Sequence, residues 1–225
     1  MHVSERLARE TGRDYALRMI KENIVSLDLA PGSSISENEL AAELGLSRTP
    51  VREALIELSK VKIVEITPQK KSLVAPIDYG LVEESRFMRN VLECAVVDLV
   101  CEMATGEDIS RLRENVKLQT FYLDNFYPQQ IMALDNEFHK ILFDIAQKSQ
   151  VYRLMNTISI HFDRVRAMAL SSVKDIKIVQ DHALITDAIA LGDAAQARKL
   201  MENHLKRYKY DAVSIRKQYP QYFSD

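Results

Sequence analysis

Apolar residues recur along most of this chain with the spacing of an α-helix, and one short stretch alternates as strands do. From residue 14 to 27 they stand at positions 16, 17, 20, 24 and 27, which predicts an amphipathic helix that Pro31 and Gly32 terminate. Residues 36–58 predict a short helix, a tight turn and a second helix. The second helix has an apolar arc of roughly 100°, formed by Val51, Ala54, Leu55 and Leu58.

Turn chemistry supports this pair of helices. Gly45 suits a left-handed position between them, Ser47 is a good N-cap, and Pro50 falls in the first turn of the second helix. Two short strands follow, at 63–67 and 73–75, on either side of a turn that contains lysines. Three helices followed by a β-hairpin is the order of a winged helix-turn-helix.

The second helix of the pair carries candidate DNA contacts near its exposed N-terminus. Arg48, Thr49 and Arg52 lie to one side of the apolar arc, which is what a helix-turn-helix presents to the major groove. Lys70 and Lys71 in the turn between the strands would reach backbone phosphates. An ordinary helical hairpin with a solvated charged face, and a solvated Lys-Lys turn, are the alternatives.

From residue 79 the pattern predicts six helices with short connections and no strands, which implies an antiparallel bundle. Their approximate bounds are 79–105, 108–127, 128–148, 151–170, 174–191 and 194–217. The predicted fold is therefore mainly α. A winged helix-turn-helix domain spans residues 8–76, with the helix-turn-helix at 36–58 and the wing at 62–76. A helical ligand-binding and dimerisation domain spans residues 79–218.

Composition changes this picture only slightly. With 225 residues, 47% hydrophobic and 28% charged, the chain is typical of a globular protein, and no apolar run is long enough to cross a membrane. The formal net charge is −2, and only residues 46–76 are locally positive, so any DNA contact must come from locally placed charge. Cys94 and Cys101 lie seven positions apart on one predicted helix, too far for a disulfide. They favour a reducing, cytoplasmic location.

The candidate site residues of the bundle are polar residues that fall on otherwise apolar helix faces. Asp135 and His139 are spaced i,i+4 beside one stripe, and His182 and His204 fall on the inward faces of two other helices. Buried unpaired, these groups would cost several kcal/mol in total, so they should satisfy one another or a shared partner. Three imidazoles and a carboxylate suit a divalent metal. Separate satisfied core histidines are the alternative, and His161 is expected to be structural or exposed.

Both halves resemble one known family. The run PGSSISENELAAELGLSRTPVREALIEL is similar to the signature of the GntR family of bacterial transcription regulators. The C-terminal half resembles the FCD ligand-binding domain of its fatty-acid-regulator-like subfamily. The matching features there are Asp135-Asn-Glu-Phe-His139, Asp181-His182, Gly192-Asp193 and His204-Leu205.

The resemblance implies roles for individual residues. It places Arg48, Thr49 and Arg52 at base or phosphate contacts and makes the Asp/His set the ligands of a zinc, nickel or similar ion, at which a small organic acid binds. It also suggests that Arg89 helps to bind an anionic ligand, although an i,i+4 ion pair with Glu93 explains that arginine equally well.

We therefore expect a ligand-responsive, homodimeric transcription regulator that binds a double-stranded DNA operator and is not an enzyme. Two alternatives remain. A metal-dependent hydrolase could use the same four residues, although Glu137, the nearest carboxylate, should point away from them. The bundle could also serve only to dimerise a DNA-binding protein.

Overall fold

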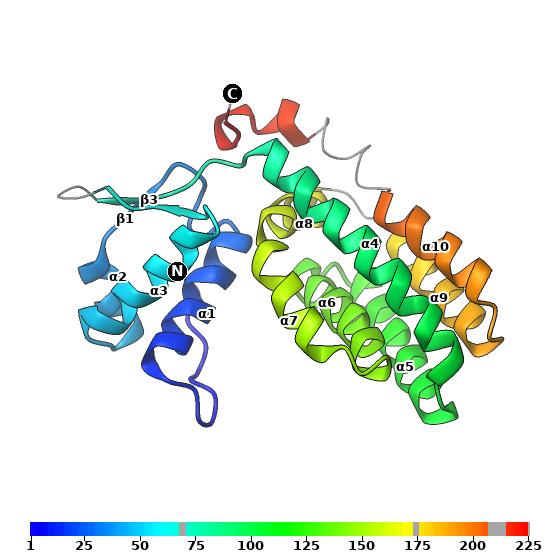
Figure 1. Ribbon diagram of the computed structural model, residues 1–225. Coiled ribbons are helices and arrows are strands. Elements are labelled where there is room, and N and C mark those ends of the chain that lie inside the picture. The colour runs from blue at the N-terminus through cyan, green and yellow to red at the C-terminus, as the bar shows by residue number, and fades with distance from the viewer. Residues whose placement is uncertain (68–70, 173–175, 207–214, 225) are drawn as a thin grey trace. The chain divides into compact units, whose positions relative to one another are not determined.

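A computed structural model describes residues 1–67, 71–172, 176–206 and 215–224. The chain divides into two compact units. The first comprises Met1–Val82, Ile160–Arg164 and Arg216–Asp225, and the second comprises Glu83–Ser159 and Val165–Ile215. Figure 1 labels the elements of each unit in chain order.

The first unit is a winged helix-turn-helix, as predicted. Its elements are α1 (Gly12–Val25), β1 (Ser34–Ile35), α2 (Glu37–Leu44), α3 (Arg48–Lys60), β2 (Val64–Glu65) and β3 (Ser72–Val74). The strands form an antiparallel sheet in the order β1-β3-β2, in which Ile35 pairs with Ser72 and Val64 with Val74. The sequence predicted β2 and β3 but missed β1, which contributes only two residues.

The turn between α2 and α3 has the predicted geometry. Gly45 takes a left-handed φ of 63°, and the Leu46 amide donates to the Ala41 carbonyl at 2.9 Å, which closes the end of α2. A residue with a Cβ would be strained in this conformation even though the space around Gly45 is open. Three residues therefore suffice to turn the chain into α3.

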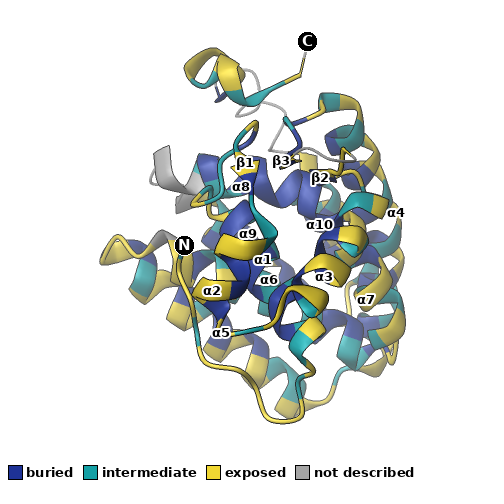
Figure 2. Cartoon of the chain, turned by 90° about the vertical axis from the view of Figure 1, so that its left-hand side faces the viewer, coloured by how far each residue is buried: buried dark blue, intermediate teal, exposed yellow. Residues whose placement is uncertain are grey.

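The buried face of α3 is the apolar arc that the sequence predicted. Its four residues are less than 5% exposed and pack in one core with α1 and the sheet; they are Val51, Ala54, Leu55 and Leu58. Figure 2 shows the same contrast in colour, with dark blue marking the buried face of each helix and yellow its exposed face. Burying this arc leaves the opposite side of α3 exposed to solvent.

Seven helices follow between Tyr79 and Lys206, where the sequence predicted six, and residues 215–218 are again helical. The seven are α4 (Tyr79–Met103), α5 (Gly106–Asp124), α6 (Pro128–Ile145), α7 (Ser149–Ile158), α8 (Ile160–Ser172), α9 (Ile176–Ala190) and α10 (Ala194–Lys206). The single helix predicted for residues 151–170 was wrong, because the chain breaks at Ser159 between α7 and α8. The predicted extension of the last helix beyond Lys206 falls partly on residues 207–214, which lie outside the described residues.

A short 3-10 helix, η1 (Pro220–Tyr222), precedes the end of the chain, and Phe223 forms a parallel bridge with Ile77. The core of the second unit draws on α4, α5, α6, α9 and α10, and the two cysteines are free, as predicted. Among the described residues, no helix combines the length and the apolar character that crossing a membrane requires.

Candidate metal centre and nucleic-acid interface

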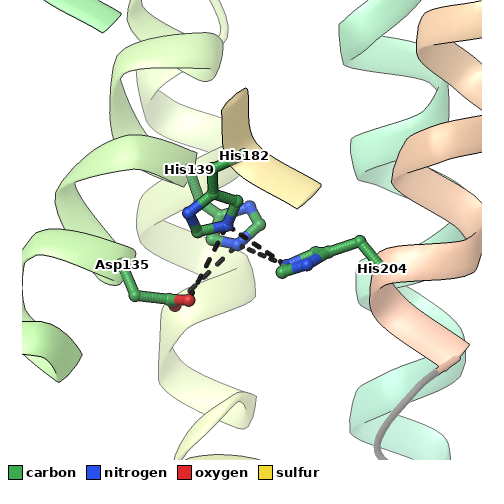
Figure 3. Close-up of side chains that lie close together, drawn as sticks. All are labelled: Asp135, His139, His182 and His204. Atoms are coloured by element: carbon green, nitrogen blue, oxygen red, sulfur yellow. Dashed lines mark hydrogen bonds and ion pairs between the residues drawn. The ribbon is translucent and has the colours of Figure 1, made fainter. Parts of the chain in front are cut away.

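Four predicted residues come together inside the second unit. Helix α6 supplies Asp135 and His139 one turn apart, α9 supplies His182, and α10 supplies His204. Each offers one ligand atom, and these atoms all lie within 4.8 Å of one another. Figure 3 shows the four side chains converging from three helices, as helical spacing alone could not establish.

The separations match a coordination sphere. Nε2 of His204 lies 3.3 Å from Nε2 of His182 and 3.3 Å from Nε2 of His139. The carboxylate oxygens of Asp135 lie 3.8 Å from the other two Nε2 atoms. Two nitrogens bound tetrahedrally to zinc at about 2.05 Å would be about 3.3 Å apart. The residues present therefore fit a divalent metal ion in both ligand type and spacing.

Each histidine directs its second ring nitrogen, Nδ1, at an oxygen on another helix. The contacts are His139 with Glu93 Oε2 at 2.5 Å, His182 with Gln119 Oε1 at 2.8 Å, and His204 with Asp181 Oδ2 at 3.5 Å. Because the oxygens beside His139 and His182 only accept, these two rings in their neutral form carry the hydrogen on Nδ1 and present the lone pair of Nε2 to the cluster. Metal-ligating histidines are typically oriented in this way.

Burial favours the neutral form of His139 and His182. It lowers the pKa of both His139 and His182, because a cationic ring would lose its hydration in the interior. The neighbouring ring of His204 lowers the pKa of His182 further. Neutral imidazole is the form that binds a metal, so these two ligands need not release a proton near pH 7.

The carboxylates are anionic for the opposite reason. Burial raises the pKa of Asp135, but Arg166, whose Nη1 lies 3.2 Å away, and the imidazoles outweigh burial and hold the pKa below its usual value. Burial likewise raises the pKa of Glu93, and Arg89 and His139 together bring it down to about 2. Asp135 therefore offers an anionic carboxylate to a metal ion, and the neighbouring Glu93 is anionic as well.

Arg89 is occupied by an ion pair. Its Nε donates to Glu93 Oε1 at 2.6 Å, and both side chains are less than 5% exposed. Of the two interpretations that the sequence left open, the i,i+4 ion pair is present in the structure, and contact with an anionic ligand stays a prediction. Through Glu93, the same arginine supports the orientation of His139.

Glu137 lies away from the cluster, as predicted. Its side chain is 41% exposed and pairs with Arg111 at 3.1 Å and Lys140 at 3.4 Å. A metal-activated water at the cluster would therefore not find its base in Glu137, the carboxylate closest to the ligands along α6. The ring of Phe138 instead walls one side, stacked on His182 with centroids 4.0 Å apart.

The candidate DNA contacts stand at the start of α3. Arg48, Thr49 and Arg52 are exposed, and Arg48 Nη2 lies 3.0 Å from Glu37 Oε2 on α2. Ser47 occupies the N-cap position, but its hydroxyl makes no capping hydrogen bond. The N-terminus of α3 thus presents hydroxyl and guanidinium groups on one exposed end.

The wing is described only in part. Lys71, directly before β3, is exposed, whereas Lys70 lies outside the described residues. His161, which the sequence suggested to be structural or exposed, is buried at 2%. Its Nε2 lies 2.6 Å from the Val61 carbonyl oxygen.

The residues that contact the histidines of the cluster were not predicted from the sequence. Asn115 and Gln119 nevertheless interrupt the apolar stripe of α5, as the histidines interrupt the stripes of their own helices.

A winged helix-turn-helix on the same chain as a helical domain with a buried Asp/His cluster defines a DNA-binding transcription regulator. Residues 14–74 match the family described as bacterial regulatory proteins, gntR family, and residues 84–207 match the FCD domain. The chain belongs to the GntR family of bacterial regulators and carries a C-terminal FCD domain.

Relatives of similar length agree with this family. An HTH-type transcriptional regulator in an unstable DNA locus of Streptomyces ambofaciens is 33% identical over 96% of this chain and 91% of its own. The HTH-type transcriptional repressor RspR of Escherichia coli K12 is 29% identical, with 92% of each chain covered. The structure of E. coli McbR/YncC superposes with a TM-score of 0.80 at 19% identity, covering 93% of this chain and 99% of that one, which shows a shared fold.

Proposed function

We propose that the FCD domain holds one divalent metal ion, zinc or nickel, through Asp135, His139, His182 and His204. One observation carries this proposal. Three imidazole nitrogens and a carboxylate oxygen converge within 4.8 Å, and His139 and His182 direct their other ring nitrogen at an acceptor outside the cluster. The Nε2 atom of His204 lies 3.3 Å from those of both His139 and His182, which is the spacing of nitrogens bound to one ion. Imidazole and carboxylate ligands suit both metals.

We further propose that a small organic acid binds at this metal as effector. Four protein ligands leave positions free when the ion expands its coordination, and a carboxylate is a suitable ligand for them. Effector binding would favour one arrangement of the domains over another and so alter operator affinity. Bound metal supplies the positive charge for the acid, while the chain's own residues fix where that charge sits.

For DNA, we infer that Arg48, Thr49 and Arg52 contact bases or phosphates in the major groove, with Ser47, Lys70 and Lys71 at phosphates. The exposed end of α3 supports this inference. Residues 46–76 carry six basic against three acidic residues, so one copy would bind weakly in physiological salt. A homodimer that reads two half-sites about one helical turn apart would supply the missing affinity.

The test starts from an operator selected from random DNA with the purified protein. Arg52→Ala should weaken binding to it about 10- to 100-fold, whereas Arg113→Ala, an exposed arginine of α5 in the second unit, should not. Stripping the metal, or adding small organic acids to the metal-loaded protein, should change operator affinity. Equal binding by both variants would remove Arg52 from the interface, and an affinity independent of metal and acid would refute the effector proposal.

A further inference from the structure

Two buried amide side chains stand behind the metal centre. Asn115 and Gln119 lie one turn apart on α5, are 5% and 0% exposed, and supply no ligand themselves. Placing an amide in an apolar interior is unfavourable unless its donors and acceptors are matched. Here they are matched in a single chain of hydrogen bonds that runs from α6 through α5 to α9.

The direction of this chain is fixed at its origin. The main-chain carbonyl of Leu134 can only accept, and Asn115 Nδ2 donates to it at 3.1 Å. The Oδ1 of Asn115 therefore faces Gln119, whose Nε2 donates to it at 2.6 Å. Gln119 is left with its Oε1 toward His182 Nδ1 at 2.8 Å, so that ring must carry its hydrogen on Nδ1.

We propose that Asn115 and Gln119 form a relay that sets the tautomer of His182 and so prepares its Nε2 as a ligand. The inference rests on the metal site proposed above. A histidine side chain in water favours the hydrogen on Nε2, and that hydrogen would point at the position of the ion. The relay removes this conflict before any metal arrives.

The anchor of the relay adds a positional role. Leu134 directly precedes the ligand Asp135 on α6, so the hydrogen bonds that orient His182 also tie α5 and α9 to the turn of α6 that supplies the carboxylate. Asn115 and Gln119 are thus positioning residues that act through His182.

Full-length protein with ¹⁵N-labelled histidine provides the decisive readout, because the tautomer of each ring can be observed without metal. In the wild type, His182 should show a hydrogen on Nδ1 and a bare Nε2. Gln119→Leu should shift His182 toward the other tautomer and lower the Zn²⁺ affinity, measured by competition with a chelator, about 10- to 100-fold. Gln119→Glu keeps an acceptor on His182 and should keep the hydrogen on Nδ1, although its carboxylate cannot donate to Asn115 Oδ1 as the amide does.

Leu123→Ala is the matched control, since Leu123 is buried one turn further along α5 and takes no part in the hydrogen bonds of the relay. It should loosen packing yet leave tautomer and affinity near wild type. If Gln119→Leu does not fold, Asn115→Leu, which frees the Gln119 amide to reverse, should give mixed tautomers. A bare Nδ1 in the wild type, or an unchanged His182 in the relay variants, would overturn the inference. A wild type that binds no Zn²⁺ would instead refute the metal site itself, while the tautomer measurement still tests the relay.

Discussion

If the proposed site binds Zn²⁺, the metal should raise the free energy of unfolding by an amount set by its Kd and its free concentration. The ligand atoms are already within 4.8 Å of one another and the rings are neutral, so binding requires little rearrangement and no proton release from His139 or His182. At a free Zn²⁺ concentration one hundred times the Kd, the free energy of unfolding should rise by about 2.7 kcal/mol. For a chain of this size, that corresponds to an increase in Tm of about 5–10 °C.

The assay is thermal unfolding of protein stripped of metal, with and without added Zn²⁺. His204→Ala should abolish the increase. This position is suitable because His204 is the most exposed of the three rings in the cluster, with a side chain 8% exposed, so its removal disturbs the core least. His161→Gln is the matched control, because that histidine lies in the first unit and should leave the increase intact. A full increase in His204→Ala would refute the assignment of His204 as a ligand.

Two further predictions concern the pKa of His161 and the backbone conformation of two glycines. Burial lowers the pKa of His161, so the unfolded chain takes up the proton more readily, and stability should be complete above about pH 6.5 and fall below it. His161→Gln, which can still donate to the Val61 carbonyl, should make urea unfolding of metal-free protein less pH-dependent between pH 7.5 and 5.5; an identical pH profile would contradict this. Gly45→Ala should destabilise by about 1–2 kcal/mol because of its left-handed φ, while Gly106→Ala, in open space at the start of α5, should stabilise by about 0.4–1 kcal/mol. The free energy of unfolding of both variants is measured by chemical denaturation. A loss of stability in both would show that the backbone argument is wrong.

The helices and the members of the Asp/His cluster could be predicted because each leaves a periodic trace. The apolar arc of α3 and the stripe of α6 repeat every three to four residues, and a histidine or aspartate on such a stripe stands out from its neighbours. What spacing could not provide was convergence, since the faces of three helices meet only through tertiary packing.

The missed elements lacked such a trace. β1 is a pair of residues held by main-chain hydrogen bonds to β3, too short to show alternation. Ser159, which separates α7 from α8, has a helical φ of −58° and ψ of −18°. No glycine or proline stands beside it, so the local sequence does not predict the break. Gln119 could have been found by the criterion applied to the histidines, because it too is polar on a buried stripe.

The side chains that contact the cluster histidines connect the helices of the second unit to one another, which bears on how an effector could be sensed. Helix α4 orients the ligand on α6 through Glu93, α5 orients the ligand on α9 through Gln119, and α9 contacts the ligand on α10 through Asp181. Five helices therefore share one set of hydrogen bonds and ion pairs, and a ligand that shifts one ring must strain the support of the next. If a metal is bound as proposed, a displacement at it would act on all five of these helices, which is the physical condition that coupling to a second domain requires.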